Sequence, residues 1–172
     1  GCRFLLPLAP TTAVEELLTQ AGPANPIART YRSGQPRLLA PDLLETPAGT
    51  RIRLVRENPA YGSLSQCSLA LTTVGANTAE LAALGVPMLV LVPTQHLHVM
   101  QAWDGLAGLL VRLPLLRWLL GVLITAWRLR HQSFLASPNI AAGRLVVPER
   151  VGAISPEAIA AEAADWLAAP GR

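Results

Sequence analysis

The chain has 172 residues, of which 51% are hydrophobic and only 15% are charged, and its formal net charge is +3. This length accommodates one domain with a sizeable core. The small net charge and the absence of a basic run interleaved with aromatic residues argue against a nucleic-acid partner, whereas the low charge content predicts that a membrane, a second domain or another partner covers part of the surface.

The amino-terminal part predicts strand and helix in alternation. Residues 3–8 form an apolar run typical of a short strand, and residues 13–20 predict a helix. Residues 23–49 contain many prolines and predict a loop-rich connection, with a short helix near residues 41–44. Residues 51–56 alternate charged and apolar side chains, which indicates a half-buried or edge strand. Because the chain begins on a strand without Met or a signal peptide, we expect a fragment of a larger fold.

The clearest pattern in the chain is strand, turn, helix, turn, strand. Residues 68–73 predict a buried strand, residues 74–78 a turn of small side chains, and residues 79–84 a helix that ends at Gly85. Residues 88–92 predict a second buried strand. Two buried strands joined by a short helix indicate a βαβ unit, so we expect an α/β fold with a mostly parallel, Rossmann-like sheet.

The most apolar segment of the chain spans residues 106–127, within a stretch at residues 106–130 that we expect to associate with a membrane. Arg112 and Arg117 lie near the middle of this window, and each costs about 2.5–3.5 kcal/mol at the centre of a spanning helix. Pro114 also interrupts the run. We therefore favour a helix in the membrane interface or docked on a partner, with a buried core helix and a true span as alternatives.

The carboxyl-terminal part predicts a strand that ends at Ser137-Pro138-Asn139, a helical turn over residues 140–143, and an extended or briefly helical stretch at residues 145–149. Ser155 followed by Pro156 is typical of a helix start, and we expect this last helix to run over residues 157–167.

No established metal or catalytic motif accompanies these elements. Cys2 and Cys67 lack metal-ligand spacing, and His96 and His98 would face different ways on a helix, so no metal site is expected. The motifs GxSxG, GxxxxGKS/T and GxGxxG are all absent, which removes the usual support for hydrolase, P-loop and dinucleotide-binding functions.

The turn at residues 75–80 is the first candidate site. Gly75 permits close approach of a ligand to the backbone, helix amides can hold a pyrophosphate, and the Glu80 carboxylate can accept hydrogen bonds from a ribose diol. Asn139 at a strand end can bond a base or a sugar. The same residue types also occur in turns without any ligand, so both interpretations stay open for each.

Two motifs in chain order carry a resemblance to a known family. The first is TTVGANTAELAALGVPM at residues 72–88, and the second is SPNIAAGR at residues 137–144 with VPE at residues 147–149. Together they resemble the carboxyl-terminal half of lipid-A-disaccharide synthase, and more narrowly the divergent lipid-A-disaccharide synthase-like branch. The resemblance covers most of residues 3–167.

This resemblance implies a glycosyltransferase of the B type, in which two Rossmann-like halves hold a UDP-sugar between them. The family transfers a UDP-activated diacylglucosamine to a lipid acceptor in lipid A biosynthesis, with inversion and release of UDP. The implied location is the cytoplasmic face of the inner membrane, as a peripheral protein, and no cofactor is implied besides the donor substrate. A homodimer is left open as a further partner.

Carried over to this sequence, the resemblance implies that UDP-sugar is bound by Gly75, Asn77, Thr78, Glu80 and Asn139. Glu80 would meet the ribose hydroxyls, and Asn139 would lie near the nucleotide or donor sugar. The acceptor site and catalytic base are implied in an amino-terminal half that this sequence does not contain, so the catalytic residues stay unassigned and the chain alone is expected to be inactive. Ala76 departs from the Thr that the family commonly has.

Two rival interpretations remain at this stage. Another B-type enzyme, such as a glycolipid synthase or a UDP-sugar epimerase, would share the nucleotide site but differ in its sugar. A non-catalytic membrane-associated fragment or interaction module would keep the fold without the chemistry.

Overall fold

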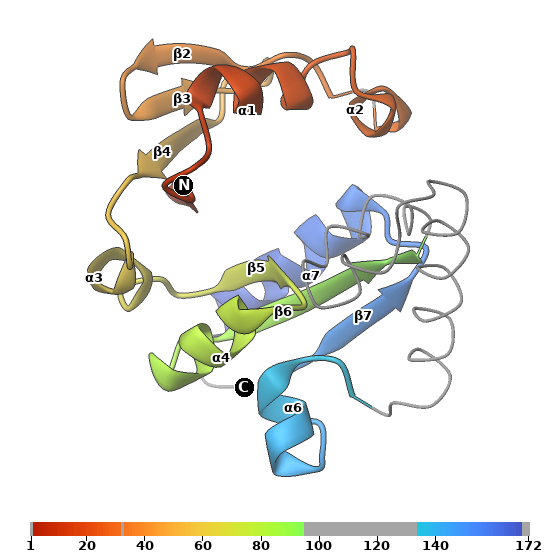
Figure 1. Cartoon of the computed structure of the whole chain (residues 1–172). Coiled ribbons are helices and arrows are strands. Elements are labelled where there is room, and N and C mark those ends of the chain that lie inside the picture. Colours follow the sequence, from red (N-terminus) through yellow and green to blue (C-terminus); the bar gives the residue numbers. More distant parts are fainter. Residues whose placement is uncertain (1, 32, 95–133, 170–172) are drawn as a thin grey trace, which may run out of the picture. The chain divides into compact units, whose positions relative to one another are not determined.

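A computed structural model describes residues 2–31, 33–94 and 134–169, which divide into two compact units, Gly1–Gln66 and Cys67–Arg172 (Figure 1). The sequence predicts one domain over residues 1–172, whereas these residues make most of their contacts within one unit or the other. Each unit contains its own β-sheet, and we describe each by itself.

Within its described residues, the first unit contains a four-stranded mixed sheet and three helices. Its strands follow the order β1-β4-β3-β2, with β1 parallel to β4 and the other two pairs antiparallel. Its elements are β1 (Phe4–Pro7), α1 (Val14–Ala21), α2 (Pro26–Thr30), β2 (Arg37–Ala40), β3 (Leu43–Glu45), β4 (Arg51–Val55) and α3 (Tyr61–Leu64).

The core of the first unit lies between α1 and one face of this sheet. Val14 of α1 packs with Leu8, Leu44 and Leu54, all of them buried. The alternation of apolar and charged residues along β4 puts Leu54 on this core face and Arg53 on the other. The half-buried strand predicted at residues 51–56 is therefore confirmed, but β4 lies inside the sheet, between β1 and β3, and not at its edge.

The loop-rich connection predicted for residues 23–49 is wrong. Asn25 caps α2 by accepting a hydrogen bond from the Ile27 amide at 2.9 Å, and Pro26 occupies the first helical turn. In place of a helix near residues 41–44, β2 and β3 form a hairpin that turns at Pro41-Asp42. Its strands are short, so residue periodicity gives only a weak signal for them.

The second unit contains a three-stranded sheet in which all strands are parallel, in the order β5-β6-β7. This α/β arrangement is compatible with the Rossmann-like fold that the sequence predicts. Its elements are β5 (Ala70–Thr73), α4 (Ala76–Ala83), β6 (Met88–Pro93), α6 (Ser137–Ala142), β7 (Glu149–Gly152) and α7 (Pro156–Ala168).

The strand predictions for this unit differ in outcome. β6 is the central strand and is buried, as the apolar run at residues 88–92 predicts. β5 is an edge strand with Leu71 51% exposed, so the prediction that it is buried is wrong. An apolar run does not distinguish a central strand from an edge strand whose neighbouring surface is open.

Around β7 and α7 the outcome is again divided. Residues 134–136 are irregular where a strand is predicted, because Pro138 begins the first turn of α6 instead of following a strand. The last helix is confirmed: Ser155 caps α7 by accepting a hydrogen bond from the Ala158 amide at 3.1 Å. Within the described residues, no helix has the length and hydropathy to cross a bilayer. The segment at residues 106–130, with His96 and His98, lies outside the described residues.

The contrast between centre and edge gives a stability prediction. Leu89 of β6 is 0% exposed and is the register partner of Leu71 in β5. We expect Leu89→Ala to lower the free energy of unfolding by about 2–5 kcal/mol, because it leaves a cavity in the core. Leu71→Ala, the same change one strand away, should cost about 0.5 kcal/mol or less. Urea denaturation followed by circular dichroism measures both, and equal costs would contradict the assigned burial.

Candidate functional site

The candidate turn joins the carboxyl end of β5 to the first residue of α4. Gly75 adopts a φ of +156°, a region that side-chain-bearing residues rarely occupy. A Cβ atom at this position would also lie 2.7 Å from Asn77 Oδ1. The backbone angle therefore favours glycine, which lets the chain pass directly from the strand into the helix.

Asn77 is exposed and folds back over the end of β5. Its Nδ2 donates to Thr72 Oγ1 and, at 3.3 Å, to the carbonyl of Thr73. Glu80, one helical turn further on, is also exposed. Among the described residues no hydrogen bond or ion pair engages its carboxylate. The start of α4 thus presents an amide side chain, and the middle of the helix presents an uncommitted carboxylate.

Thr78 serves inside the protein and not at its surface. The side chain is fully buried, and its hydroxyl donates to the Gly75 carbonyl at 2.8 Å. The same oxygen accepts a hydrogen bond from the Ser137 amide at 3.1 Å. One hydroxyl therefore closes the turn and ties α4 to the start of α6, which leaves it little capacity for a ligand.

Asn139 is also fully buried, and its amide group is saturated with hydrogen bonds. Its Oδ1 accepts from the amides of Val146 and Val147 at 2.7 and 2.8 Å. Its Nδ2 donates to the Val147 carbonyl at 2.8 Å and to Glu149 Oε1 at 2.7 Å. A side-chain amide offers two donors and two acceptor positions, and here all four are used within the protein.

Glu149 is the partner that sequence reasoning missed. Its carboxylate accepts hydrogen bonds from the amides of Leu135 and Ala136, the latter at 2.8 Å, in addition to Asn139 Nδ2. It therefore fixes the irregular residues before α6 to the first residue of β7. The only signal in the sequence is the VPE motif at residues 147–149, and that motif alone does not reveal which donors the carboxylate meets.

The predicted site residues therefore fall into two groups. Gly75 and Asn77 lie at the start of α4 and Glu80 lies further along the same helix, and all three are exposed. Thr78 and Asn139 both reach the start of α6 but are buried and engaged internally. The direct nucleotide contact that the resemblance implies for Asn139 and Thr78 would require internal hydrogen bonds to break, so these two residues are better described as supports of the turn.

A second feature lies beside α7. A pocket of about 290 Å³ is lined by residues of β7, of the following turn and of α7, including Glu149, Ser155 and Ile159. Arg150 pairs with Glu162 at its border, with Arg150 Nε 2.8 Å from Glu162 Oε2, and this hydrogen bond raises the pKa of the arginine above its ordinary value. β5, β6 and β7 are parallel, so their carboxyl ends lie at the same end of the sheet. The turn that follows β7 and the Gly75 turn that follows β5 are therefore both at that end.

The described residues include no cluster of three or more His, Cys, Asp or Glu side chains that could hold a metal ion. No protein-family model, no curated protein and no solved structure shows detectable similarity to the chain. The residues themselves are therefore what distinguishes one function from another.

The saturated amide of Asn139 gives the second prediction. Asn139→Ala strips Glu149 Oε1 and three backbone groups of a partner, so we expect it to lower the free energy of unfolding by about 2–5 kcal/mol. Asn77→Ala removes the same side chain from an exposed position and should cost about 1 kcal/mol or less. Chemical denaturation of the two variants side by side measures the difference. A cost for Asn139→Ala no larger than that for Asn77→Ala would refute the supporting role.

Proposed function

We propose that this chain is the nucleotide-binding part of a UDP-sugar-dependent glycosyltransferase that works on a lipid acceptor at a membrane surface. The observation that carries the proposal is the Gly75 turn. It follows the carboxyl end of a parallel strand, opens directly into α4, and leaves Glu80 without a partner among the described residues. Ligands of open parallel sheets bind outside the carboxyl ends of the strands.

In the proposed complex, the chemistry of each end of the turn matches a part of UDP. The first amides of a helix have no acceptor within the helix, and the helix dipole favours negative charge at that end, so the start of α4 suits a diphosphate. Gly75 has no side chain to obstruct that approach. The Glu80 carboxylate suits the two ribose hydroxyls, since an ionised carboxylate accepts several hydrogen bonds.

Thr78 and Asn139 enter this proposal as supports and not as contacts. The Thr78 hydroxyl closes the turn by donating to the Gly75 carbonyl and accepts a hydrogen bond from the Ser137 amide. Asn139 and Glu149 fix the residues on either side of α6. A site held by internal hydrogen bonds loses less conformational freedom when a ligand binds. Catalysis itself is assigned to the complete two-half enzyme that the resemblance implies.

The second candidate is a non-catalytic membrane-associated module. It is favoured by one observation: two of the five residues expected to bind UDP-sugar are committed to the interior of the protein. A related enzyme with another UDP-sugar, such as a glycolipid synthase or an epimerase, would share the turn. Titration with different nucleotides separates the module, which would show no nucleotide preference, and titration with different UDP-sugars separates the related enzyme, which would prefer a different sugar.

Calorimetric titration of the chain with UDP, and with ADP and CDP for comparison, tests the proposal. We expect UDP to bind most tightly and Glu80→Gln to weaken it about tenfold or more, since a hydrogen bond to a charged group contributes about 1.5–3 kcal/mol. Glu157→Gln, a matched change in the first turn of α7, should leave the affinity unchanged. Equal affinity for all three nucleotides would favour the non-catalytic module, and an unaltered Kd for Glu80→Gln would exclude the ribose role.

A further inference from the structure

The sheet of the first unit has two faces of opposite character. One face packs under α1 through Leu44, Leu54 and their neighbours. The register of the strands assigns the alternate residues to the other face: Leu5 is paired with Arg53, and Arg53 with Leu43, while Arg51 is paired with Glu45. We call this second face the arginine face.

The arginines of this face are largely open to solvent. The side chains of Arg37, Arg51 and Arg53 are 75%, 70% and 69% exposed. Arg3 lies one residue before β1, and strand alternation assigns it to the same face, where it is also exposed. Four guanidinium groups thus stand on one side of a small sheet.

The carboxylates on this side do not balance them. Glu45 is shared between Arg37, whose Nε donates to it at 2.8 Å, and Arg51, whose Nε is 3.8 Å away. Asp42 meets Arg53 at 3.7 Å. Exposed pairs of this kind contribute little to stability, and two carboxylates among four arginines leave the arginine face positively charged.

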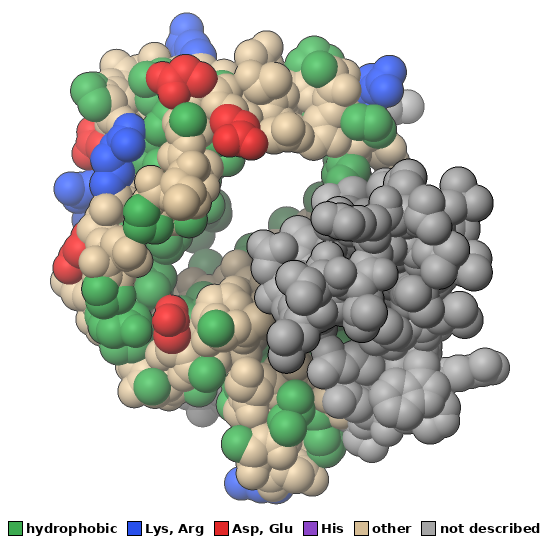
Figure 2. Space-filling view, in the orientation of Figure 1, with side chains coloured by type: hydrophobic (Ala, Val, Ile, Leu, Met, Phe, Trp, Pro, Cys, Tyr) green, Lys and Arg blue, Asp and Glu red, His purple; other side chains and the backbone are tan. Residues whose placement is uncertain are grey.

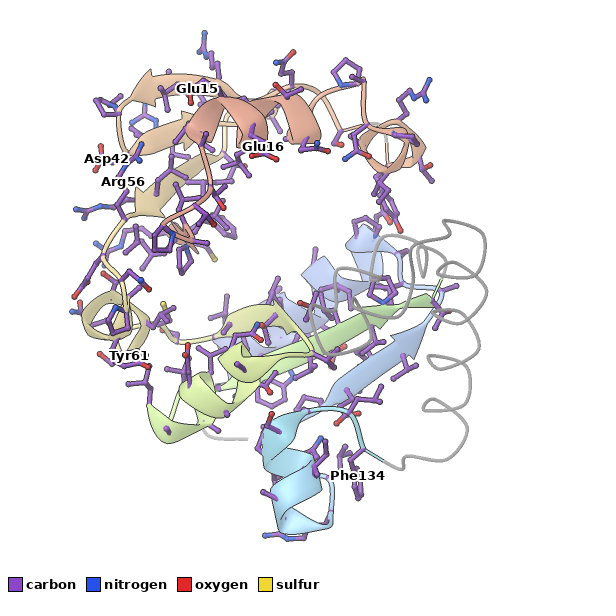
Figure 3. All side chains as sticks on the ribbon, in the orientation of Figure 1. Glu15, Glu16, Asp42, Arg56, Tyr61 and Phe134 are labelled. Atoms are coloured by element: carbon purple, nitrogen blue, oxygen red, sulfur yellow. The ribbon has the colours of Figure 1, made fainter. Side chains whose placement is uncertain are left out.

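Two other acidic residues of the unit lie on the opposite side. Glu15 and Glu16 are exposed in the first turn of α1, the helix that covers the core face (Figure 3). Figure 2 shows acidic side chains over α1. The unit is therefore polarised, with two carboxylates over α1 and an excess of arginines over carboxylates on the far side of the sheet, and such a distribution orients a protein on a charged surface.

Exposed leucines accompany the arginines. Leu5 lies on this face in the edge strand β1, beside Arg53, and is 37% exposed. Leu39, which lies at the irregularity in the register of β2, is 42% exposed and has no register partner in β3. Bulged positions re-aim a side chain, and apolar groups among arginines suit the boundary between headgroups and acyl chains, where guanidinium groups meet phosphate.

We propose that the arginine face docks on an anionic lipid bilayer and thereby turns the first unit toward the membrane. The choice of a membrane rests on the proposed function, while the charge separation and the exposed leucines belong to the unit itself. A nucleic acid fits less well, because the alternate positions of this face carry leucines and no aromatic ring on which bases could stack.

Co-sedimentation with two kinds of vesicle tests the proposal: phosphatidylcholine alone, and phosphatidylcholine mixed with phosphatidylglycerol. The apolar segment at residues 106–130 is expected to favour both, so the informative quantity is the ratio of the two partition coefficients. Each basic residue near an anionic surface changes binding about fivefold, so the double variant Arg51→Gln/Arg53→Gln should lower the ratio about 25-fold. Added salt should lower the ratio for the unaltered chain as well.

The matched control is Arg29→Gln/Arg144→Gln, which removes the same charge from α2 and from the end of α6 and should change the ratio far less. Circular dichroism and UDP affinity are measured on both variants, so a loss of folding or of the nucleotide site is told apart from a loss of docking. An unchanged ratio in the first variant, or an equal fall in the control, would overturn the proposal. So would retention by an RNA homopolymer without any excess binding to anionic vesicles.

Discussion

The second unit depends on a carboxylate and an amide that satisfy each other inside the protein. The Glu149 carboxylate accepts hydrogen bonds from the amides of Leu135 and Ala136 and from the side chain of Asn139. The Asn139 side chain also bonds both the amide and the carbonyl of Val147. A partly buried carboxylate without donors would be costly, so this network determines where α6 starts and where β7 begins. Through Ser137 and Thr78 the same network reaches the turn at Gly75.

Because of that connection, the candidate site residues divide into proposed ligand contacts and supports. The residues that can meet a ligand are the exposed ones on the turn, and the buried polar residues behind them hold the turn in place. The helix amides and the Glu80 carboxylate supply complementary chemistry for a nucleoside diphosphate, with the positive end of α4 next to a hydrogen-bond acceptor. In the first unit, the charge difference between α1 and the arginine face supplies complementary chemistry for an anionic membrane surface, because it favours one orientation of the unit on that surface.

Much of this could be predicted from the sequence where a local pattern determines the outcome. The buried run of β6 and the cap at Ser155 both follow from neighbouring residues. The hairpin at residues 37–45 could not be predicted, because its strands are too short for periodicity to appear. The roles of Asn139 and Glu149 could not be predicted either, because hydrogen-bond saturation depends on which chain segments meet in space, and an Asn beside a Pro is equally consistent with a ligand contact.

In the proposed complex, UDP binds the exposed turn and leaves the buried network of Asn139 and Glu149 intact. Mapping of chemical-shift changes by NMR during titration of the chain with UDP tests it most directly. We expect the largest changes on the amides of residues 75–80, while the side-chain amide signals of Asn139 stay in place and remain protected from exchange. Changes centred on Asn139, or a spectrum in which residues 75–80 do not respond to UDP, would contradict it.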